Sequence, residues 1–172
     1  LGSVASAGSN PKHMAMSGSL YGNPHNCGPV VNNLDIMILG ATEIDTDFNV
    51  NVITGSDGTI MGASGGHNDT AAGSKISIVV TNLLKGRLCV LRDKVTTVTS
   101  PGETIDALVT DRGIAINPRR TDLLEKLKDS RLPIMDISKL KEIGDKLAGK
   151  PDSIEFTDKI VGVVEYRDGT VI

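Results

Sequence analysis

The sequence predicts an open α/β or α+β domain, and two observations support this prediction. Between residues 34 and 118, short β-branched or apolar runs are separated by Gly, Asn, Asp and Pro, as in the strands of a sheet. From residue 119 onward, the apolar residues recur with the period of amphipathic helices. Because the strands come first and the helices follow, we expect a sheet with helices packed against it.

The expected sheet rests on a series of short apolar runs. Residues 34–39 (LDIMIL) and 75–81 (KISIVVT) are continuous apolar segments, which is typical of strands buried on both faces. Between and after them, shorter runs predict further strands at residues 50–54, 59–62, 87–91, 94–100, 106–110 and 113–116.

Two amphipathic helices are expected after the sheet. Residues 119–130 place their leucines on one stripe, and Thr121 or Asp122 is the expected N-cap. Residues 137–149 carry a second stripe, opened by Asp136 or Ser138. The two stripes consist of Leu123, Leu124 and Leu127, and of Ile137, Leu140, Ile143 and Leu147.

The two ends of the chain have a different character. Residues 1–31 are rich in Gly, Ser, Asn and Pro, which predicts an extended, loop-dominated entry segment whose order comes from packing on something else. It is expected to be part of the same domain as residues 32–172, the domain proper. Residues 159–172 predict a strand, an Arg-Asp-Gly turn and the beginning of a partner strand. Because the sequence lacks an initiator Met and ends inside an expected strand, we expect a fragment of a larger protein.

Composition and charge argue against several kinds of partner. Aromatic residues make up 2% of the chain and Trp is absent, so little is available for stacking on bases. The 18 basic and 21 acidic residues are mixed, which leaves no basic stripe for nucleic acid or a membrane surface. No apolar run approaches the ~18–20 residues that span a bilayer, and no signal peptide is evident. Cys27 and Cys89 fit no ligand pattern, so we expect reduced thiols in a cytoplasmic protein.

The most informative segment is residues 54–73, which contains six glycines and the polar cluster His67, Asn68 and Asp69 between two expected strands. At residues 56–58 (SDG) a tight hairpin turn is the plainer interpretation. At residues 62–69 (GASGGHND) we expect a ligand-binding loop. Gly65 and Gly66 can bring main-chain N–H groups close to a ligand without obstruction by a Cβ atom, as acyl and phosphate sites require.

The polar cluster allows more than one interpretation. His67 could be oriented by Asp69, but side chains at i and i+2 seldom bond unless a turn brings them together. We favour His67 as a lone donor to a substrate carboxylate or thioester oxygen, helped by the positive end of a helix that starts near Asn68 and Asp69. The run 68–70 also has the composition of an N-cap, so part of its character is structural. His13 and His25 are expected on the surface.

Three acidic residues, Glu43, Asp45 and Asp47, follow the first expected strand, where ligands of open α/β sheets bind. Their spacing resembles a calcium loop, but the glycine and the distal Glu of an EF-hand are missing. The plainer interpretation is that Asp45 and Asp47 point outward from a strand edge. The sequence also lacks the GxSxG, HExxH, GxxxxGK[ST] and GxGxxG motifs, which removes the usual support for hydrolase, zinc-protease, NTPase and dehydrogenase functions.

Three long strings, at residues 34–73, 94–123 and 159–172, closely resemble the C-terminal half of the citrate lyase alpha subunit family. The chain is also similar, more distantly, to the family I CoA-transferases, whose Gly-x-Gly-Gly loop corresponds to residues 62–69. The resemblance implies a NagB/RpiA/CoA-transferase-like α/β fold, with an open, mostly parallel sheet and flanking helices. This domain would be the second of two similar domains in the full subunit.

The resemblance also implies a function. The full subunit would exchange acetyl for citryl on a carrier thioester during citrate cleavage to acetate and oxaloacetate. Its cofactor would be a CoA-type thioester, either acetyl-CoA or the phosphoribosyl-dephospho-CoA group of an acyl carrier protein, with no metal. The carrier (gamma) and lyase (beta) subunits would be partners in an oligomer. Another acyl-CoA:carboxylate CoA-transferase, or a half-domain that is inert in isolation, remain the alternatives.

The expected site follows from these considerations. The nucleophilic Glu of the CoA-transferases would precede this sequence, and the resemblance implies direct passage of the acyl group between carboxylates, so no nucleophile is assigned. We expect Gly65, Gly66 and His67 to stabilise the thioester oxyanion. Arg112 or Arg119 could add a cationic contact to a tricarboxylate. The remaining expected substrate contacts are Glu43, Asn49, Asn51, Gly62, Asn68 and Asp69.

Overall fold

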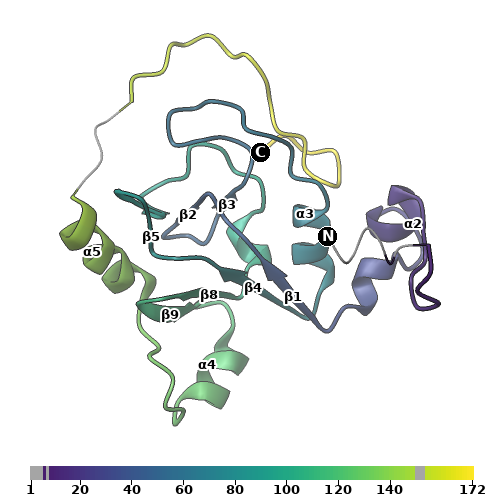
Figure 1. The fold of residues 1–172 in the computed structure, drawn as a ribbon, viewed down its shortest axis with the longest axis horizontal. Coiled ribbons are helices and arrows are strands. Elements are labelled where there is room, and N and C mark those ends of the chain that lie inside the picture. Colours follow the sequence, from purple (N-terminus) through teal and green to yellow (C-terminus); the bar gives the residue numbers. More distant parts are fainter. Residues whose placement is uncertain (1–5, 7, 150–153) are drawn as a thin grey trace.

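A four-stranded mixed sheet lies at the centre of the structure, a computed structural model that describes residue 6, residues 8–149 and residues 154–172 (Figure 1). Its strand order is β1-β4-β8-β9, with β1 and β8 parallel to β4 and with β9 antiparallel to β8. The bounds are Ile36–Leu39 for β1, Ile76–Val80 for β4, Ala107–Thr110 for β8 and Gly113–Ile116 for β9. The predicted α/β class and the mostly parallel sheet are therefore confirmed.

The described residues also form two smaller sheets. The first has the order β3-β2-β7, with β2 antiparallel to β3 and parallel to β7, and the second is a hairpin of β5 and β6. Their bounds are Glu43–Asp45 for β2, Val50–Asn51 for β3, Leu84–Lys85 for β5, Leu88–Cys89 for β6 and Leu91–Arg92 for β7. Strand β2 of the first small sheet follows β1 in the chain. The segment after β3 then leads to α3.

Helices lie against the central sheet. Helix α3 (His67–Gly73) contacts β1 and β4, whereas α5 (Ile137–Ala148) contacts β9, β6 and β7. Between these elements a core of buried residues includes Ile44, Leu108 and Leu140. The other helices are α2 (Gly18–Gly22), α4 (Thr121–Leu127) and the 3-10 turns η1 (Val30–Asn33) and η2 (Gly102–Thr104). Within the described part of the chain, no helix has the length and apolar character needed to cross a bilayer.

Several expected strands differ from the structure. Strand β1 was expected to be buried, but it is an edge strand, and Ile36 and Ile38 are 57% and 64% exposed. Residues 94–100 form no strand, and residues 59–62 contribute only a bridge between Ile60 and Thr54. That bridge closes the tight turn expected at residues 56–58, in which Gly58 has a positive φ of 80°. Propensity alone cannot distinguish an extended loop from a paired strand.

Of the N-caps expected for the two amphipathic helices, one agrees with the structure and the other does not. Helix α5 begins as predicted, because the Asp136 side chain accepts a hydrogen bond of 2.7 Å from the Ser138 N–H. Helix α4 has Arg120 at the N-cap and no side-chain cap, so the expected cap at Thr121 or Asp122 is wrong. Asp122 instead accepts two hydrogen bonds from the Arg120 guanidinium, which lower the Asp122 pKa to about 2.

The N-terminal segment that contains α2 and the C-terminal hairpin turn both lie next to α3. Helix α2 and η1 pack against α3, so the loop-rich entry segment contains a short helix. From residue 154 the chain follows an extended path across the molecule, shown in yellow in Figure 1. Residues 154–163 of this path form no strand, and a hairpin turn follows, with a bridge between Glu165 and Val171.

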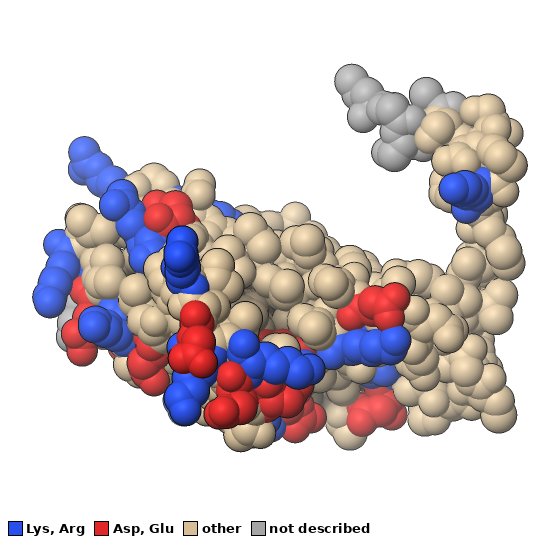
Figure 2. Space-filling model, turned by 90° about the horizontal axis from the view of Figure 1, so that it is seen from below, with Lys and Arg blue, Asp and Glu red and all other residues tan. Residues whose placement is uncertain are grey.

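Figure 2 shows that Lys and Arg side chains alternate with Asp and Glu on the face it displays.

Candidate functional site

The turn before α3 presents two unused main-chain donors. Gly65 has a φ of +54°, a conformation that favours glycine, and Gly66 is the N-cap of α3 without a side-chain cap. Both residues are exposed, and within the described residues neither N–H group donates a hydrogen bond. The next N–H, that of His67, donates to the Ser64 carbonyl oxygen over 3.1 Å. Gly65 and Gly66 can therefore donate to a ligand without breaking an internal bond.

The imidazole of His67 is held inside the protein by both ring nitrogens. Nε2 lies 2.9 Å from the Gly40 carbonyl oxygen, and Nδ1 lies 2.8 Å from Ser100 Oγ. Because a carbonyl oxygen only accepts, Nε2 carries the proton, and neutral His67 accepts from Ser100 at Nδ1. Burial lowers the His67 pKa, against an opposing effect of the Gly40 bond. A His67 contact with substrate would therefore require one internal bond to break.

Asn68 and Asp69 line a cavity of about 590 Å³ beside this turn. Asn68 is only 8% exposed, and its Oδ1 accepts from the Asp69 N–H. Its Nδ2 donates to no group among the described residues, so the amide is a further unused donor at the cavity. Asp69 is bonded to Arg167 and not to His67, so the structure does not form the His67–Asp69 pair. Gly65 and Ser64 line the same cavity.

A second cavity, of about 720 Å³, adjoins the first. It lies between residues 53–64 and residues 156–165, and it is lined by Gly62 and by several exposed apolar side chains of the C-terminal path. Ser64 and Glu165 line both cavities, so the two spaces meet at the glycine turn. Of the expected residues, Gly62 lines this second cavity, whereas Gly65, Asn68 and Asp69 line the first.

Glu43 and Asn51 lie elsewhere, in the interior. Glu43 is 2% exposed, forms an ion pair with Arg92 at 3.2 Å and accepts from Asn51 Nδ2 at 3.0 Å. Burial raises the Glu43 pKa, but the hydrogen bonds from Asn51 and Thr96 and the charge of Arg92 outweigh it, so the pKa lies below its usual value. Asn51 is fully buried. In this arrangement both side chains hold β2 and β3 together.

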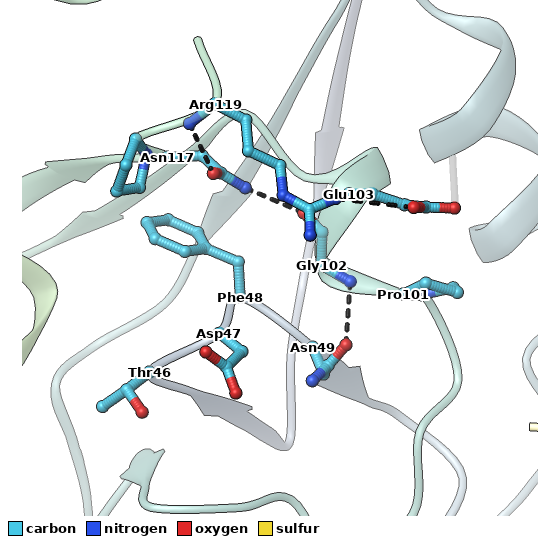
Figure 3. Close-up of a pocket in the computed structure, with 10 residues that line it drawn as sticks. Thr46, Asp47, Phe48, Asn49, Pro101, Gly102, Glu103, Asn117 and Arg119 are labelled. Atoms are coloured by element: carbon cyan, nitrogen blue, oxygen red, sulfur yellow. Dashed lines mark hydrogen bonds and ion pairs between the residues drawn. The ribbon is translucent and has the colours of Figure 1, made fainter.

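Asn49 and Arg119 line a third, separate cavity of about 410 Å³ (Figure 3). Asn49 Oδ1 accepts from the Gly102 N–H at 2.9 Å, and the Gly102 carbonyl oxygen accepts from Asn117 Nδ2 at 2.8 Å. Arg119 Nη1 lies 3.4 Å from Glu103 Oε2. The other expected cation, Arg112, pairs with its neighbour Asp111 on the surface. The structure therefore does not bring these residues to the glycine turn.

The acidic run after β1 is only partly exposed. Asp45 is buried and accepts from the N–H groups of Asp47 and Asn49, so the expectation that it points outward is wrong. Asp47 is exposed, as expected. Among residues 6, 8–149 and 154–172, no group of three or more His, Cys, Asp or Glu side chains is placed to hold a metal ion.

Two residues of the site were missed by the sequence analysis. Ser100 lies 33 positions from His67, in a run expected to be an ordinary strand. Arg167 lies 98 positions from Asp69 and was recognised only as part of a turn. A charged residue in a terminal turn carries no local signal of its partner.

Comparison with known proteins identifies close relatives. The sequence matches the family model described as citrate lyase, alpha subunit (CitF), over residues 2–172. It is 48% identical to the citrate lyase alpha chain of Klebsiella pneumoniae and 51% identical to that of Haemophilus influenzae. Both matches cover 95% of this chain, but 32% and 33% of the relatives. The chain thus spans about a third of the length of these curated relatives.

One solved structure is closely similar. It is a putative alpha subunit of citrate lyase from Streptococcus mutans, determined in complex with citrate. The TM-score is 0.93 at 48% sequence identity, and the match covers 98% of this chain and 33% of that chain. The fold described above is therefore the fold of one segment of that longer protein.

Proposed function

This chain belongs to the citrate lyase alpha subunit family, and from that premise we propose that it forms part of the acyl-transfer site of such a subunit. The reaction is the exchange of acetyl for citryl on a thioester. The thioester is the CoA-type prosthetic group of an acyl carrier protein, or acetyl-CoA. The carrier and lyase subunits are the proposed partners, and citrate and acetate are the exchanged acids.

The observation that supports this proposal is the pair of unused N–H groups at Gly65 and Gly66. In the proposed reaction a citrate carboxylate oxygen attacks the acetyl carbonyl carbon, the C–S bond breaks and the thiolate leaves. The thiolate then attacks the citryl carbonyl of the resulting anhydride, and acetate leaves. Each attack places negative charge on a carbonyl oxygen. Fixed main-chain donors stabilise that charge without reorganisation during the reaction.

Asn68 supports the same assignment. Its amide is almost fully buried, yet Nδ2 has no partner in the described part of the protein and lies at the cavity beside the glycines. Because Nδ2 lies at the cavity and has no internal partner among the described residues, it can donate to a ligand oxygen without breaking a hydrogen bond of the protein. The citrate bound to the Streptococcus mutans relative supports a tricarboxylic acid as the acceptor.

The test is a pair of glycine substitutions in the full-length subunit. Gly65→Asn adds a side chain to the cavity beside the two donors, and Gly86→Asn is the matched control. Both glycines have a positive φ, +54° and +62°, and both have open space where a Cβ would lie. Asn tolerates this conformation, so the backbone cost of the two changes is similar.

We expect Gly65→Asn to lower kcat/KM for citrate-dependent transfer from an acetyl thioester by about 10²–10³-fold, because the added side chain keeps the reacting oxygen away from the N–H groups, and losing one oxyanion donor has a cost of that size. Gly86→Asn should leave the rate unchanged. If the two variants retain equal activity, the glycine turn is not the acyl-transfer site and the proposal is wrong.

A further inference from the structure

Arg167 joins three segments that are far apart in the sequence. Its Nε donates to Asp69 Oδ1 at 3.0 Å, and its Nη2 donates to the Gly22 carbonyl oxygen at 2.6 Å. Its side chain is 12% exposed and that of Asp69 is 26% exposed, so the ion pair is largely shielded from water. The C-terminal hairpin turn, α2 and α3 are thereby fixed to one another beside the cavity.

The contact between Gly22 of α2 and the Asp69 side chain leaves no room for a side chain at position 22. A Cβ on Gly22 would lie within 2.7–2.9 Å of the Asp69 side chain, so only glycine allows α2 to approach α3 this closely. The Asp69 carboxylate therefore occupies a defined place between Gly22 and Arg167. In the described structure it is engaged by the protein, which makes it a poor candidate for a direct substrate contact.

Helix α3 depends on such contacts because it lacks a cap. It has only seven residues, and no side chain accepts a hydrogen bond at its N-cap, Gly66. Short helices without caps fray at their ends. Two anchors hold the first turn instead: His67 is bonded to Gly40 and Ser100 on one side, and Asp69 is bonded to Arg167 on the other.

We propose that Arg167 is a positioning residue for the acyl-transfer site, acting through Asp69 to hold the first turn of α3 and hence the Gly65 and Gly66 N–H groups and the Asn68 amide. This inference rests on the proposed function of the glycine turn. Arg167 itself touches neither reacting group. Because catalysis by fixed donors depends on their placement, a small displacement of this turn lowers the rate more than it lowers substrate binding.

The experiment uses the full-length subunit with the variants Arg167→Ala, Asp69→Ala and the double variant. We expect each to lower kcat for acetyl transfer to citrate by about 10–100-fold, as for a misplacement near 1 Å, with little change in the KM for citrate. Since the two side chains act as one unit, the double variant should be no slower than either single variant. Arg167→Lys should recover part of kcat, because an ammonium can still pair with Asp69.

A matched control separates positioning from general stability. Arg120 also makes a largely shielded ion pair, to Asp106 at 2.7 Å, and a more exposed one to Asp122 at 2.8 Å, at the start of α4. Arg120→Gln should lower Tm without lowering kcat at 20 °C. Hydrogen exchange provides a second readout, and the hydrogen-bonded amides of His67, Asp69 and Thr70 should exchange faster in Arg167→Ala than in Arg120→Gln. This readout applies even if Arg167→Ala is too slow to assay.

The possible outcomes distinguish the two proposals. If Gly65→Asn abolishes transfer while Arg167→Ala retains the full kcat and unchanged exchange at residues 67, 69 and 70, only the role of Arg167 is overturned. If the double variant is slower by the product of the single effects, Asp69 and Arg167 act separately and the inference fails. If Gly65→Asn retains transfer, the proposed function fails first.

Discussion

The His67 imidazole donates from Nε2 to the Gly40 carbonyl oxygen across 2.9 Å, and so joins the first residue of α3 to the residue after β1. Gly40 lies at the carboxyl end of β1, where ligands bind in open α/β sheets. The same imidazole accepts from Ser100, so the glycine turn is fixed to the sheet on one side. The geometry makes His67 an anchor of the site.

Stability should depend on pH through His67. Burial lowers its pKa below the ordinary 6.5, so as pH falls the unfolded chain binds the proton before the folded chain does. The stabilising effect is present above pH 6.5 and is lost as the pH falls below that value. In urea unfolding between pH 7.5 and 5.5, His67→Gln should lose stability less steeply than the original chain. His25→Gln, at an exposed site, is the control, and an equal slope in His67→Gln would contradict the assignment.

Asn117 should stabilise the fold around the cavity shown in Figure 3, which its side chain lines. Its Nδ2 donates to the Gly102 carbonyl oxygen at 2.8 Å and to that of Ile105 at 2.7 Å, and its side chain is buried. Asn117→Ala leaves both carbonyl groups without this donor, which should lower the free energy of unfolding by about 2–4 kcal/mol. The exposed Asn32→Ala should change it by less than about 0.5 kcal/mol. Similar effects of the two substitutions in chemical unfolding would show that the network contributes little.

Gly144 of α5 packs against Cys89 of β6, and this contact should not tolerate a methyl group at position 144. A Cβ on Gly144 would overlap Cys89 Sγ, and the α5–β6 contact lies in the buried core. We expect Gly144→Ala to destabilise the chain by about 1–3 kcal/mol, despite the better helix propensity of Ala. Adding Cys89→Ala removes the sulfur and should recover part of this loss in thermal unfolding. A double variant less stable than Gly144→Ala would place the strain elsewhere.

The two thiols should react at different rates. Cys27 is exposed, whereas Cys89 is buried, and burial raises the pKa of the Cys89 thiol, so little reactive thiolate is present. A thiol-specific chromogenic reagent should label one cysteine rapidly in the folded chain and the second only after denaturation. Cys27→Ser should remove the fast phase. Rapid labelling that persists in Cys27→Ser would mean that β6 opens readily.

Local patterns in the sequence predicted much of the fold. The apolar period and the Asp136 cap predicted α5, and the continuous or alternating runs predicted β4, β8 and β9. The glycine turn was also found, because glycines beside polar residues stand out between strands. These features depend on residues within a few positions of one another, so they are visible without the tertiary structure.

The composition of the site could be predicted only in part. Gly65 and Asn68 were expected at the turn and lie there with unused donors, but their catalytic and binding roles remain predictions. Glu43 and Asn51 look like ligands in the sequence, but they pair with each other in the interior. Polar residues next to a strand end have the same appearance in the sequence whether they face a ligand or each other.

The sequence by itself determined the periodic elements, the turn glycines and the family to which the chain belongs. Only the tertiary structure decided which side chains meet: Arg167 with Asp69, 98 positions apart, and His67 with Ser100, 33 positions apart. The physical reason is that helical and strand periods are local consequences of backbone geometry, whereas the partner of a charged or polar side chain depends on the path of the whole chain.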